Sequence, residues 1–377
     1  MSSVAHAPSS YVPRLLLQRL AERPPLVAPE GRRAPGVLLL SDIQGFTALV
    51  ERFTSAGRDG LEELTWILNG YFADLVEVVH AHGGDVLSIA GDAFLCYWPV
   101  AGDDIRDAIL RAAQCGQAIQ ERLHDRPAGR DHRFGTRIGV GSGDLVTAFV
   151  GGVGARWELV ATGAALRSAI AAEQRAAAGQ VVIAPAAWTT IAHSCVGVTG
   201  ADGFGVLAAV REPVGVRAIA EPAPRESDDV LRPFLPPAVL DRLLLPRAEW
   251  LAESRRVTVL MASLPPLADA GATALGEAHD GVRAFQEVVE RCEGTTKVDV
   301  DDKGILLLAV FGMPPRAHED DAERAAYAAQ QLRESLATLG IATGMGIATG
   351  RAICGAFGSD RRRDYMVRGE VINLAAR

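Results

Sequence analysis

Two aspartates lie where apolar stretches typical of buried strands come to an end. Asp42 ends the run "GVLLLSD", and Asp92 lies in a Gly-Asp turn between the runs "LSIA" and "AFLCYW". Taken alone, each has an ordinary interpretation as a turn or helix-cap residue. If the sheet brings the two strands together, however, the carboxylates meet. A pair of acids is what Mg²⁺ uses beside the phosphates of a substrate.

The turn "IQGFT" follows Asp42 and has Gly45 where a helix is expected to begin. Backbone amides at a junction of strand, turn and helix hold phosphate oxygens well. A carboxylate beside them would repel phosphate unless a cation lay between. The two acids and the turn together therefore predict a site for Mg²⁺ and a phosphorylated ligand.

The segment "YMVRGEVINLAAR" contributes a second set of polar side chains. Asn373 and Arg377 are four residues apart, which places both on one face of an expected helix. An arginine is always charged and binds phosphate through two parallel hydrogen bonds. The preceding basic run "SDRRRD" (359–364) is interpreted as a solvated hairpin tip, with a pyrophosphate contact as the alternative.

Composition limits the class of protein. The 377 residues suit two domains, and 49% of them are apolar, which is ample for two cores. The net charge of −8 argues against a nucleic-acid partner. The five cysteines form no CxxC pair, as expected of reduced, buried thiols. We find neither a signal peptide nor an apolar run long enough for a spanning helix, so we predict a cytoplasmic protein without a membrane partner.

The chain contains an internal repeat. "RIGVGSGDLVTAFVGG" and "GMGIATGRAICGAFGS" share three glycines at a constant separation of 207 residues, and an Ala-rich helix precedes each segment. A repeat this long indicates a duplicated domain rather than a solenoid. The predicted organisation is a leader (1–35), a first domain (36–220), a linker with a short helix (221–254) and a second domain (255–377).

The first half is expected to form an antiparallel sheet covered by helices, which is an α+β fold. The second half repeats the order as far as the helix after its second hairpin, so we expect the second domain to be incomplete at its C-terminus. The order expected for the first half is a strand (37–42), helices (45–82), a hairpin (85–99), a helix (104–124), a hairpin (136–160), a helix (163–177) and further strands to about 219.

These motifs resemble the catalytic domain of the class III nucleotidyl cyclases. The segments "VLLLSDIQGFTALVERF" and "GGDVLSIAGDAFLCYW" carry the resemblance in the first half, and "KVDVDDKGILLLAVFG" and "YMVRGEVINLAAR" carry it in the second. The chain is similar to the tandem soluble adenylyl cyclases, which include bicarbonate-responsive members. The resemblance implies two ferredoxin-like domains that form a pseudo-dimer within one chain and share an active site at their interface.

The first half would supply the metal and phosphate side of that site. The resemblance implies two Mg²⁺ ions, for which Mn²⁺ can substitute, held by Asp42, Asp92 and the backbone carbonyl of Ile43. It implies that backbone amides hold the β- and γ-phosphates. These amides belong to Gln44, Gly45, Phe46 and Thr47.

The second half would supply the base and transition-state side. Lys297 matches the lysine that contacts the adenine ring, and Met366 stands where the family usually has Thr or Asp. Base selectivity would then rest on Lys297 and on backbone groups such as that of Val367. Asn373 would orient the ribose, and Arg377 would stabilise the charge that develops on the α-phosphoryl group.

The two halves are not equivalent. Ser263 occupies the place of Asp42 in the second half, whereas Arg167 and Ala171 occupy the places of Asn373 and Arg377 in the first. Ser88 stands where the family often has a lysine. We therefore expect one competent site and one degenerate site, and the degenerate site is either a regulatory pocket or a filled interface.

The sequence thus predicts an adenylyl cyclase that converts ATP to 3′,5′-cyclic AMP and pyrophosphate. In such a phosphoryl transfer the protein mainly positions groups and stabilises charge. The alternative is a non-catalytic nucleotide-binding module that controls other domains of a larger signalling protein. In both cases we expect regulatory domains beyond the C-terminus of this chain.

Overall fold

The computed structural model describes most of the chain. Gly91 of the predicted Gly-Asp turn lies outside the described residues, as do residues 1–6 of the leader and 221–227 and 244–251 of the linker. The described ranges are 7–23, 25–55, 57–90, 92–100, 104–129, 132–215, 228–243, 252–267, 271–301 and 303–377.

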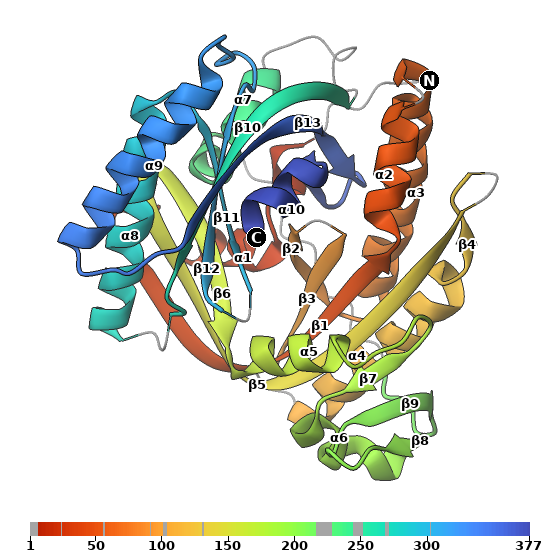
Figure 1. The fold of residues 1–377 in the computed structure, drawn as a ribbon. Helices are drawn as coiled ribbons and strands as arrows, with labels where there is room; N and C mark the ends of the chain where they lie inside the picture. Colours follow the sequence, from red (N-terminus) through yellow and green to blue (C-terminus); the bar gives the residue numbers. More distant parts are fainter. Residues whose placement is uncertain are drawn as a thin grey trace.

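The first half is built on a nine-stranded sheet in the order β2-β3-β1-β5-β7-β9-β8, with β4 and β6 also paired to β5 (Figure 1). Its strands are β1 (Glu30–Gln44), β2 (Asp85–Ala90), β3 (Ala93–Pro99), β4 (Arg126–Pro127), β5 (Arg133–Val153), β6 (Arg156–Gly163), β7 (Val181–Ile183), β8 (Cys195–Thr199) and β9 (Gly205–Val210). Its helices are η1 (Pro8–Tyr11), α1 (Arg14–Glu22), α2 (Phe46–Ser55), α3 (Gly57–Ala81), α4 (Ile105–Leu123), α5 (Ala164–Glu173), α6 (Pro185–Ile191) and η2 (Ala192–Ser194).

The second half has a five-stranded sheet in the order β11-β12-β10-β13-β14. Its strands are β10 (Glu253–Leu264), β11 (Thr295–Val300), β12 (Ile305–Phe311), β13 (Met345–Gly358) and β14 (Arg363–Arg368). Its helices are α8 (Ala272–Arg291), α9 (Asp321–Thr338) and α10 (Glu370–Ala376), and the short helices η3 (Asp228–Phe234) and α7 (Pro237–Leu243) precede it. The predicted α+β class and the two-domain, ferredoxin-like pseudo-dimer are confirmed.

The main hydrophobic core of each half contains side chains from the other half. The core beneath the first sheet includes Ile353, Phe357 and Met366 of the second half. The core of the second half includes Val146 and Val160 of the first. Burial of each such side chain stabilises the folded chain by about 1.5–3 kcal/mol. The hairpins β5–β6 and β13–β14, each of which packs into the core of the other half, therefore hold the two halves together.

The packing of each hairpin against the other half is nearly symmetric, as the shared glycines show. The amide of Gly151 donates to Nδ1 of His279 on α8 at 3.2 Å, and the amide of Gly358 donates to Oδ1 of Asn69 on α3 at 3.0 Å. A long helix of each half therefore binds the hairpin of the other half at an equivalent glycine.

Two further glycines explain why helices lie so close to the sheets. A Cβ on Gly139 would lie 2.3 Å from the carbonyl oxygen of Ala169 on α5, and a Cβ on Gly346 would lie 2.0 Å from that of Ala375 on α10. This pair of repeated glycines thus marks the points where a helix backbone touches a strand.

The interpretation of the basic run at 359–364 as a solvated tip is wrong for Arg362. This residue is 5% exposed, and its guanidinium donates to the carbonyls of Val86 and Leu87 at 3.0 and 3.2 Å. The hairpin tip packs on β2 of the first half, so its arginine joins the halves instead of facing water.

The expected burial of the cysteines is confirmed, since all five are buried and none forms a disulfide. None of the described helices has the length and apolar character needed to cross a bilayer.

Candidate active site

The two predicted metal ligands lie together at one end of the first sheet. Asp42 is the register partner of Ala93, and the amide of Ile43 donates to the carbonyl of Asp92 at 3.1 Å. This bond ties the turn between β2 and β3 to the end of β1. Burial and the nearby charge of Asp42 raise the pKa of the Asp92 carboxyl. Such mutual repulsion is relieved when a cation lies between two carboxylates.

The segment after Asp42 turns at Gly45, whose φ is +77°. This left-handed conformation favours glycine, although a side chain there would meet no neighbour. Ile43 and Phe46, on either side of the turn, are 1% and 4% exposed and anchor it in the core. Gln44 is half-buried and ends β1, whereas the side chain of Thr47 lies outside the described part of the structure. The first amides of α2 lack acceptors within the helix, as a phosphate cradle requires.

Arg137 and Glu173 join the two aspartates, although neither was a candidate from the sequence. Arg137 on β5 is the register partner of Asp42 and donates to its Oδ2 at 2.5 Å. The same guanidinium forms an ion pair with Glu173 at 2.9 Å. Burial raises the pKa of Glu173, Arg137 partly offsets this, and the charges of Asp42 and Asp92 add to it. The cluster therefore holds three acids around one arginine.

Lys297 reaches this region from the second half. Its Nζ donates to the carbonyl of Ile89 on β2 at 3.1 Å and to Oδ2 of Asp364 on β14 at 2.8 Å. Burial by itself would lower the pKa of Lys297, but the carboxylates of Asp299 and Asp364 outweigh it and raise the pKa. The lysine is therefore a fixed, charged donor, and Asp364 is an acceptor beside it that the sequence analysis did not identify.

Met366 and Val367 face in opposite directions on β14, as neighbours on a strand do. Met366 is 1% exposed and packs in the first core. Val367 lines a cavity of about 150 Å³ with Lys297 and Asp364. Of the three residues predicted to contact the base, Lys297 and Val367 thus share this cavity, whereas the Met366 side chain faces the core.

Asn373 and Arg377 lie at the exposed side of α10. The helix packs through Val371 and Ala375, which are each 4% exposed. Within the described part of the chain, neither Asn373 nor Arg377 makes a hydrogen bond or an ion pair. Asn373 lies within α10, whereas Arg377 follows the last helical residue, Ala376, as the C-cap.

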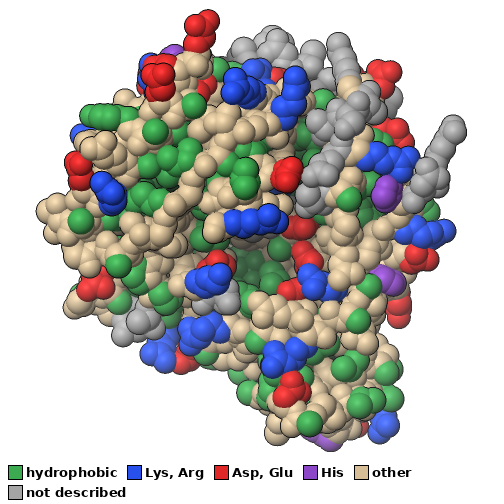
Figure 2. Space-filling view, viewed as in Figure 1, with side chains coloured by type: hydrophobic (Ala, Val, Ile, Leu, Met, Phe, Trp, Pro, Cys, Tyr) green, Lys and Arg blue, Asp and Glu red, His purple; other side chains and the backbone are tan. Residues whose placement is uncertain are grey.

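The end of α10 borders a hollow between the two halves. Figure 2 shows this hollow with acidic and basic side chains around its rim, and Figure 1 places the C-terminal end of α10 beside it. The groups predicted to act in catalysis are therefore accessible from this side.

The register of the two sheets explains why the halves differ in chemistry. Leu40 pairs with Gly139 and Met261 with Gly346, so Ser263 occupies the position of Asp42 in the second half. Gly344 takes the position of Arg137 by the same register. The second half therefore lacks both the acid and its arginine.

The counterpart of Lys297 in the first half is Ser88. Ser88 pairs with Leu95, as Lys297 pairs with Leu308 on the equivalent strand. The Ser88 hydroxyl donates to Oδ1 of Asp299 at 3.4 Å, and Ser88 lines the same cavity of about 150 Å³ as Lys297. An apolar cluster that includes Leu87 lies next to it, with Leu38, Ala161, Leu166, Ala169 and Ile170.

The residues at the sheet end suit a divalent cation. Asp42 and Asp92 lie together, and burial, followed by the charge of Asp42, raises the pKa of the Asp92 carboxyl. Mg²⁺ uses one or two carboxylates and takes its remaining oxygens from water and phosphate. No set of three or more His, Cys, Asp or Glu with metal-site geometry occurs among the described residues, so any cation here would depend on the ligand as well.

Comparison with known proteins gives a consistent result. Residues 33–201 match the family model for the adenylate and guanylate cyclase catalytic domain. Adenylate cyclase type 10 of Rattus norvegicus is 27% identical over 381 residues, and that of Homo sapiens is 26% identical over 382. These alignments cover 91% of this chain, whereas the chain spans only 23% of the length of each relative.

Two further proteins are similar over different extents. Adenylate cyclase 1 of Rhizobium meliloti (strain 1021) is 33% identical over 154 residues, which is 40% of this chain and 22% of that protein. The crystal structure of a class III adenylyl cyclase-like ATP-binding protein from Pseudomonas aeruginosa has a TM-score of 0.59. It covers 92% of this chain and 81% of that one at 14% identity, so it supports the fold alone.

Proposed function

Because this chain belongs to the class III adenylyl and guanylyl cyclases, we propose that it converts ATP to 3′,5′-cyclic AMP and pyrophosphate at one site between its halves. The observation that carries the proposal is the division of chemistry between them. Asp42, Asp92 and Arg137 come from the first half, and Lys297 extends from the second half to Ile89 of the first. The equivalent place in the second half has Ser263 and no such cluster.

The acidic cluster would bind the cation and the triphosphate. Asp42, Asp92 and the carbonyl of Ile43 would hold two Mg²⁺ ions, or Mn²⁺ in their place. Such ions lower the pKa of the attacking 3′-hydroxyl and neutralise charge on the phosphates. Arg137 is bound to Asp42. With a cation on that carboxylate, the guanidinium would be available to the phosphate oxygens.

The cavity beside Lys297 would bind the base. The Lys297 ammonium is a donor, and the Asp364 carboxylate beside it is an acceptor. Adenine presents the matching pair, since its N1 accepts and its 6-amino group donates. The Asp364 carboxylate would therefore accept the hydrogen bond from the 6-amino group that the buried thioether of Met366 does not accept. Val367 would add backbone groups and an apolar wall to the cavity.

The exposed face of α10 would act on the reacting centre. Asn373 would hold the ribose, and Arg377 would stabilise the charge that develops on the α-phosphoryl group. Stabilisation of developing charge by a fixed cation is the main contribution a protein makes to such a reaction. Within the described structure neither side chain has a hydrogen-bond or ion-pair partner that the substrate would have to displace.

A non-catalytic nucleotide-binding module is the second candidate. It is favoured by the same feature of α10, because two exposed side chains without supporting contacts are not pre-positioned for catalysis. In that case ATP would bind at the acidic cluster without turning over. Regulatory domains outside this chain and a cytoplasmic location remain predictions of the sequence under both proposals.

One assay separates the two functions. Purified protein is incubated with ATP and either Mg²⁺ or Mn²⁺, and cyclic AMP and ATP binding are measured on the same sample. The cyclase proposal expects cyclic AMP and its loss in Asp42→Asn. The binding-module proposal expects bound ATP and no cyclic AMP with either metal.

A further inference from the structure

A second cavity lies between α1 and the first sheet, away from the candidate active site. It has a volume of about 530 Å³, which is within the usual range for small-molecule sites. Arg32 lines it from β1, and Asp42 lies ten residues further along the same strand. At about 3.3 Å per residue the two side chains are roughly 30 Å apart. The cavity is therefore a separate feature of the fold.

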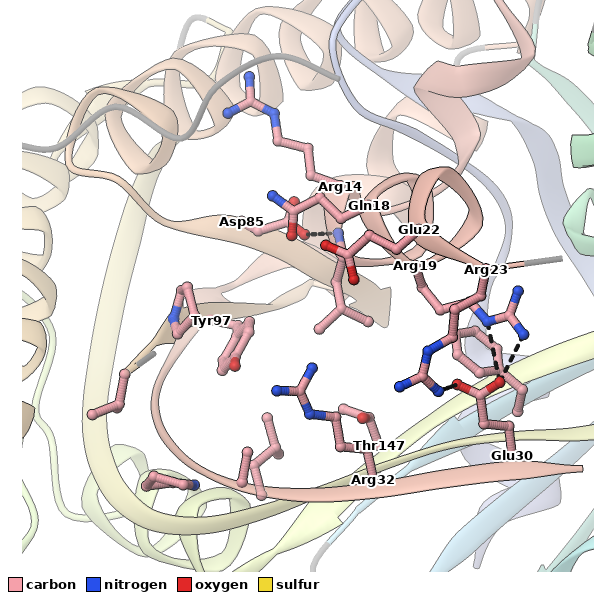
Figure 3. Close-up of a pocket in the computed structure, with 17 residues that line it drawn as sticks. Arg14, Gln18, Arg19, Glu22, Arg23, Glu30, Arg32, Asp85, Tyr97 and Thr147 are labelled. Atoms are coloured by element: carbon pink, nitrogen blue, oxygen red, sulfur yellow. Dashed lines mark hydrogen bonds and ion pairs between the residues drawn. The ribbon is translucent and has the colours of Figure 1, made fainter. Parts of the chain in front are cut away.

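The cavity exists because α1 turns a polar side toward the sheet. Leu16 and Leu20 of α1 are 1% and 6% exposed and pack into the core shared with β10 and η3. Gln18 and Glu22 lie one turn apart on another side of the helix and line the cavity. Figure 3 shows them across the open space from the sheet. A polar helix surface does not close on a sheet as an apolar one does, so space remains.

The sheet wall of the cavity presents hydrogen-bond donors. Arg32 and Thr147 are direct register partners on β1 and β5. Tyr97 reaches over the same face, since its ring lies 2.9 Å from where a Cβ on Gly36 would be. In Figure 3 the side chains of Arg32, Tyr97 and Thr147 all point into the cavity. Burial raises the pKa of Tyr97, and the charge of Arg32 only partly offsets this, so its hydroxyl stays a donor.

Arg32 differs from the other cations of this cavity. Arg19 and Arg23 are held by Glu30 at 2.7 and 2.9 Å, and the side chain of Arg14 points away from the open space in Figure 3. Within the described residues Arg32 makes neither a hydrogen bond nor an ion pair. Its guanidinium is therefore available to a ligand.

The remaining walls decide what kind of ligand fits. Leu15, Pro35, Leu145 and Phe149 give the cavity an apolar floor. Glu22 on the opposite wall would repel a second negative charge if the ligand carried one. We propose that this cavity binds a small organic molecule with a single carboxylate on an apolar body, the carboxylate being held by Arg32, Tyr97 and Thr147.

The test uses octanoate as the probe and octanamide as its uncharged counterpart. Binding to the whole chain is measured by isothermal titration calorimetry for the wild type and three variants. We expect octanoate to bind with a stoichiometry of one and at least tenfold more tightly than octanamide. Arg32→Gln should weaken octanoate at least tenfold and Tyr97→Phe about threefold, as expected for a charge-assisted and a neutral hydrogen bond.

The matched control is Arg33→Gln. Arg33 is the next residue on β1, points to the other face of the sheet and pairs with the exposed Asp144, so its replacement should change octanoate affinity less than twofold. Circular dichroism melts show whether each variant is folded. The proposal is wrong if octanoate does not bind at millimolar concentration, if octanamide binds equally well, or if Arg32→Gln and Arg33→Gln weaken binding to the same extent. Displacement of octanoate by ATP would also overturn it, because the probe would then occupy the nucleotide site.

Discussion

Replacement of Asp364 by alanine should weaken the binding of ATP and not that of GTP. In the proposed complex the carboxylate accepts a hydrogen bond from the 6-amino group of adenine beside the Lys297 ammonium, which lies 2.8 Å away. Guanine has a carbonyl oxygen at that position, which a carboxylate does not bind. The variant therefore removes a preference for adenine.

The size of the effect follows from the burial of the pair. The side chains of Lys297 and Asp364 are 26% and 14% exposed, so a donor that loses its acceptor here is largely shielded from water. Such a loss costs about 1–3 kcal/mol, which corresponds to a roughly 5- to 150-fold weaker complex. We expect a value toward the lower end of this range, about tenfold, because both groups retain some contact with water.

The assay is calorimetric titration of ATP and GTP into wild type, Asp364→Ala and Asp364→Asn, with Mg²⁺ present. The asparagine variant keeps one acceptor oxygen and should recover most of the ATP affinity. Asp360→Ala, at an acid on the same hairpin that is 77% exposed, is the matched control. If Asp364→Ala lowers ATP and GTP affinity equally while its thermal melt is unchanged, the carboxylate does not read the base.

Three further predictions concern stability and the position of α10. Arg362→Ala should lower the free energy of unfolding by about 2–4 kcal/mol, because it leaves two buried carbonyls of β2 without a donor, whereas the exposed neighbour Arg361→Ala should change it by less than 0.5 kcal/mol in urea titrations. Gly346→Ala should displace α10 and reduce cyclic AMP formation at least tenfold, since its Cβ would lie 2.0 Å from a helix carbonyl; the control is Gly276→Ala, which meets no neighbour, and equal activity of the two variants would contradict the packing argument. Burial, followed by nearby arginines, lowers the pKa of His80 to about 3, so the unfolded chain binds a proton below pH 6.5 that the folded chain does not. Folding stability should therefore fall by about 2 kcal/mol between pH 8 and pH 5, and His80→Phe should remove that part of the pH dependence; an identical dependence in both proteins would contradict it.

Local sequence patterns were sufficient to place the two aspartates and the repeat. Asp42 and Asp92 each follow an apolar strand, and strand pairing brings them to the same edge of the sheet. The shared glycines predicted the duplication through their constant spacing, and one pair, Gly139 and Gly346, marks equivalent close contacts between helix and strand in the two halves. The strand register also places Ser263 at the position in the second half that is equivalent to Asp42, as the alignment of the halves predicts.

The residues that the sequence did not reveal depend on contacts between distant segments. Arg137 lies in an ordinary strand, and only its register with Asp42 shows what it binds. Asp364 and Arg362 lie in a run of charges typical of a solvated turn. Their burial comes from packing against the other half of the chain, which a local pattern does not report.

We propose that one interface site is catalytic and the other is not. This is tested by measuring the formation of cyclic AMP from ATP by wild type, Asp42→Asn and Ser263→Ala in the presence of Mg²⁺ or Mn²⁺. The proposed mechanism predicts cyclic AMP from wild type and from Ser263→Ala and none from Asp42→Asn. Cyclic AMP formation that survives Asp42→Asn, or no cyclic AMP from wild-type protein that binds ATP, would contradict it.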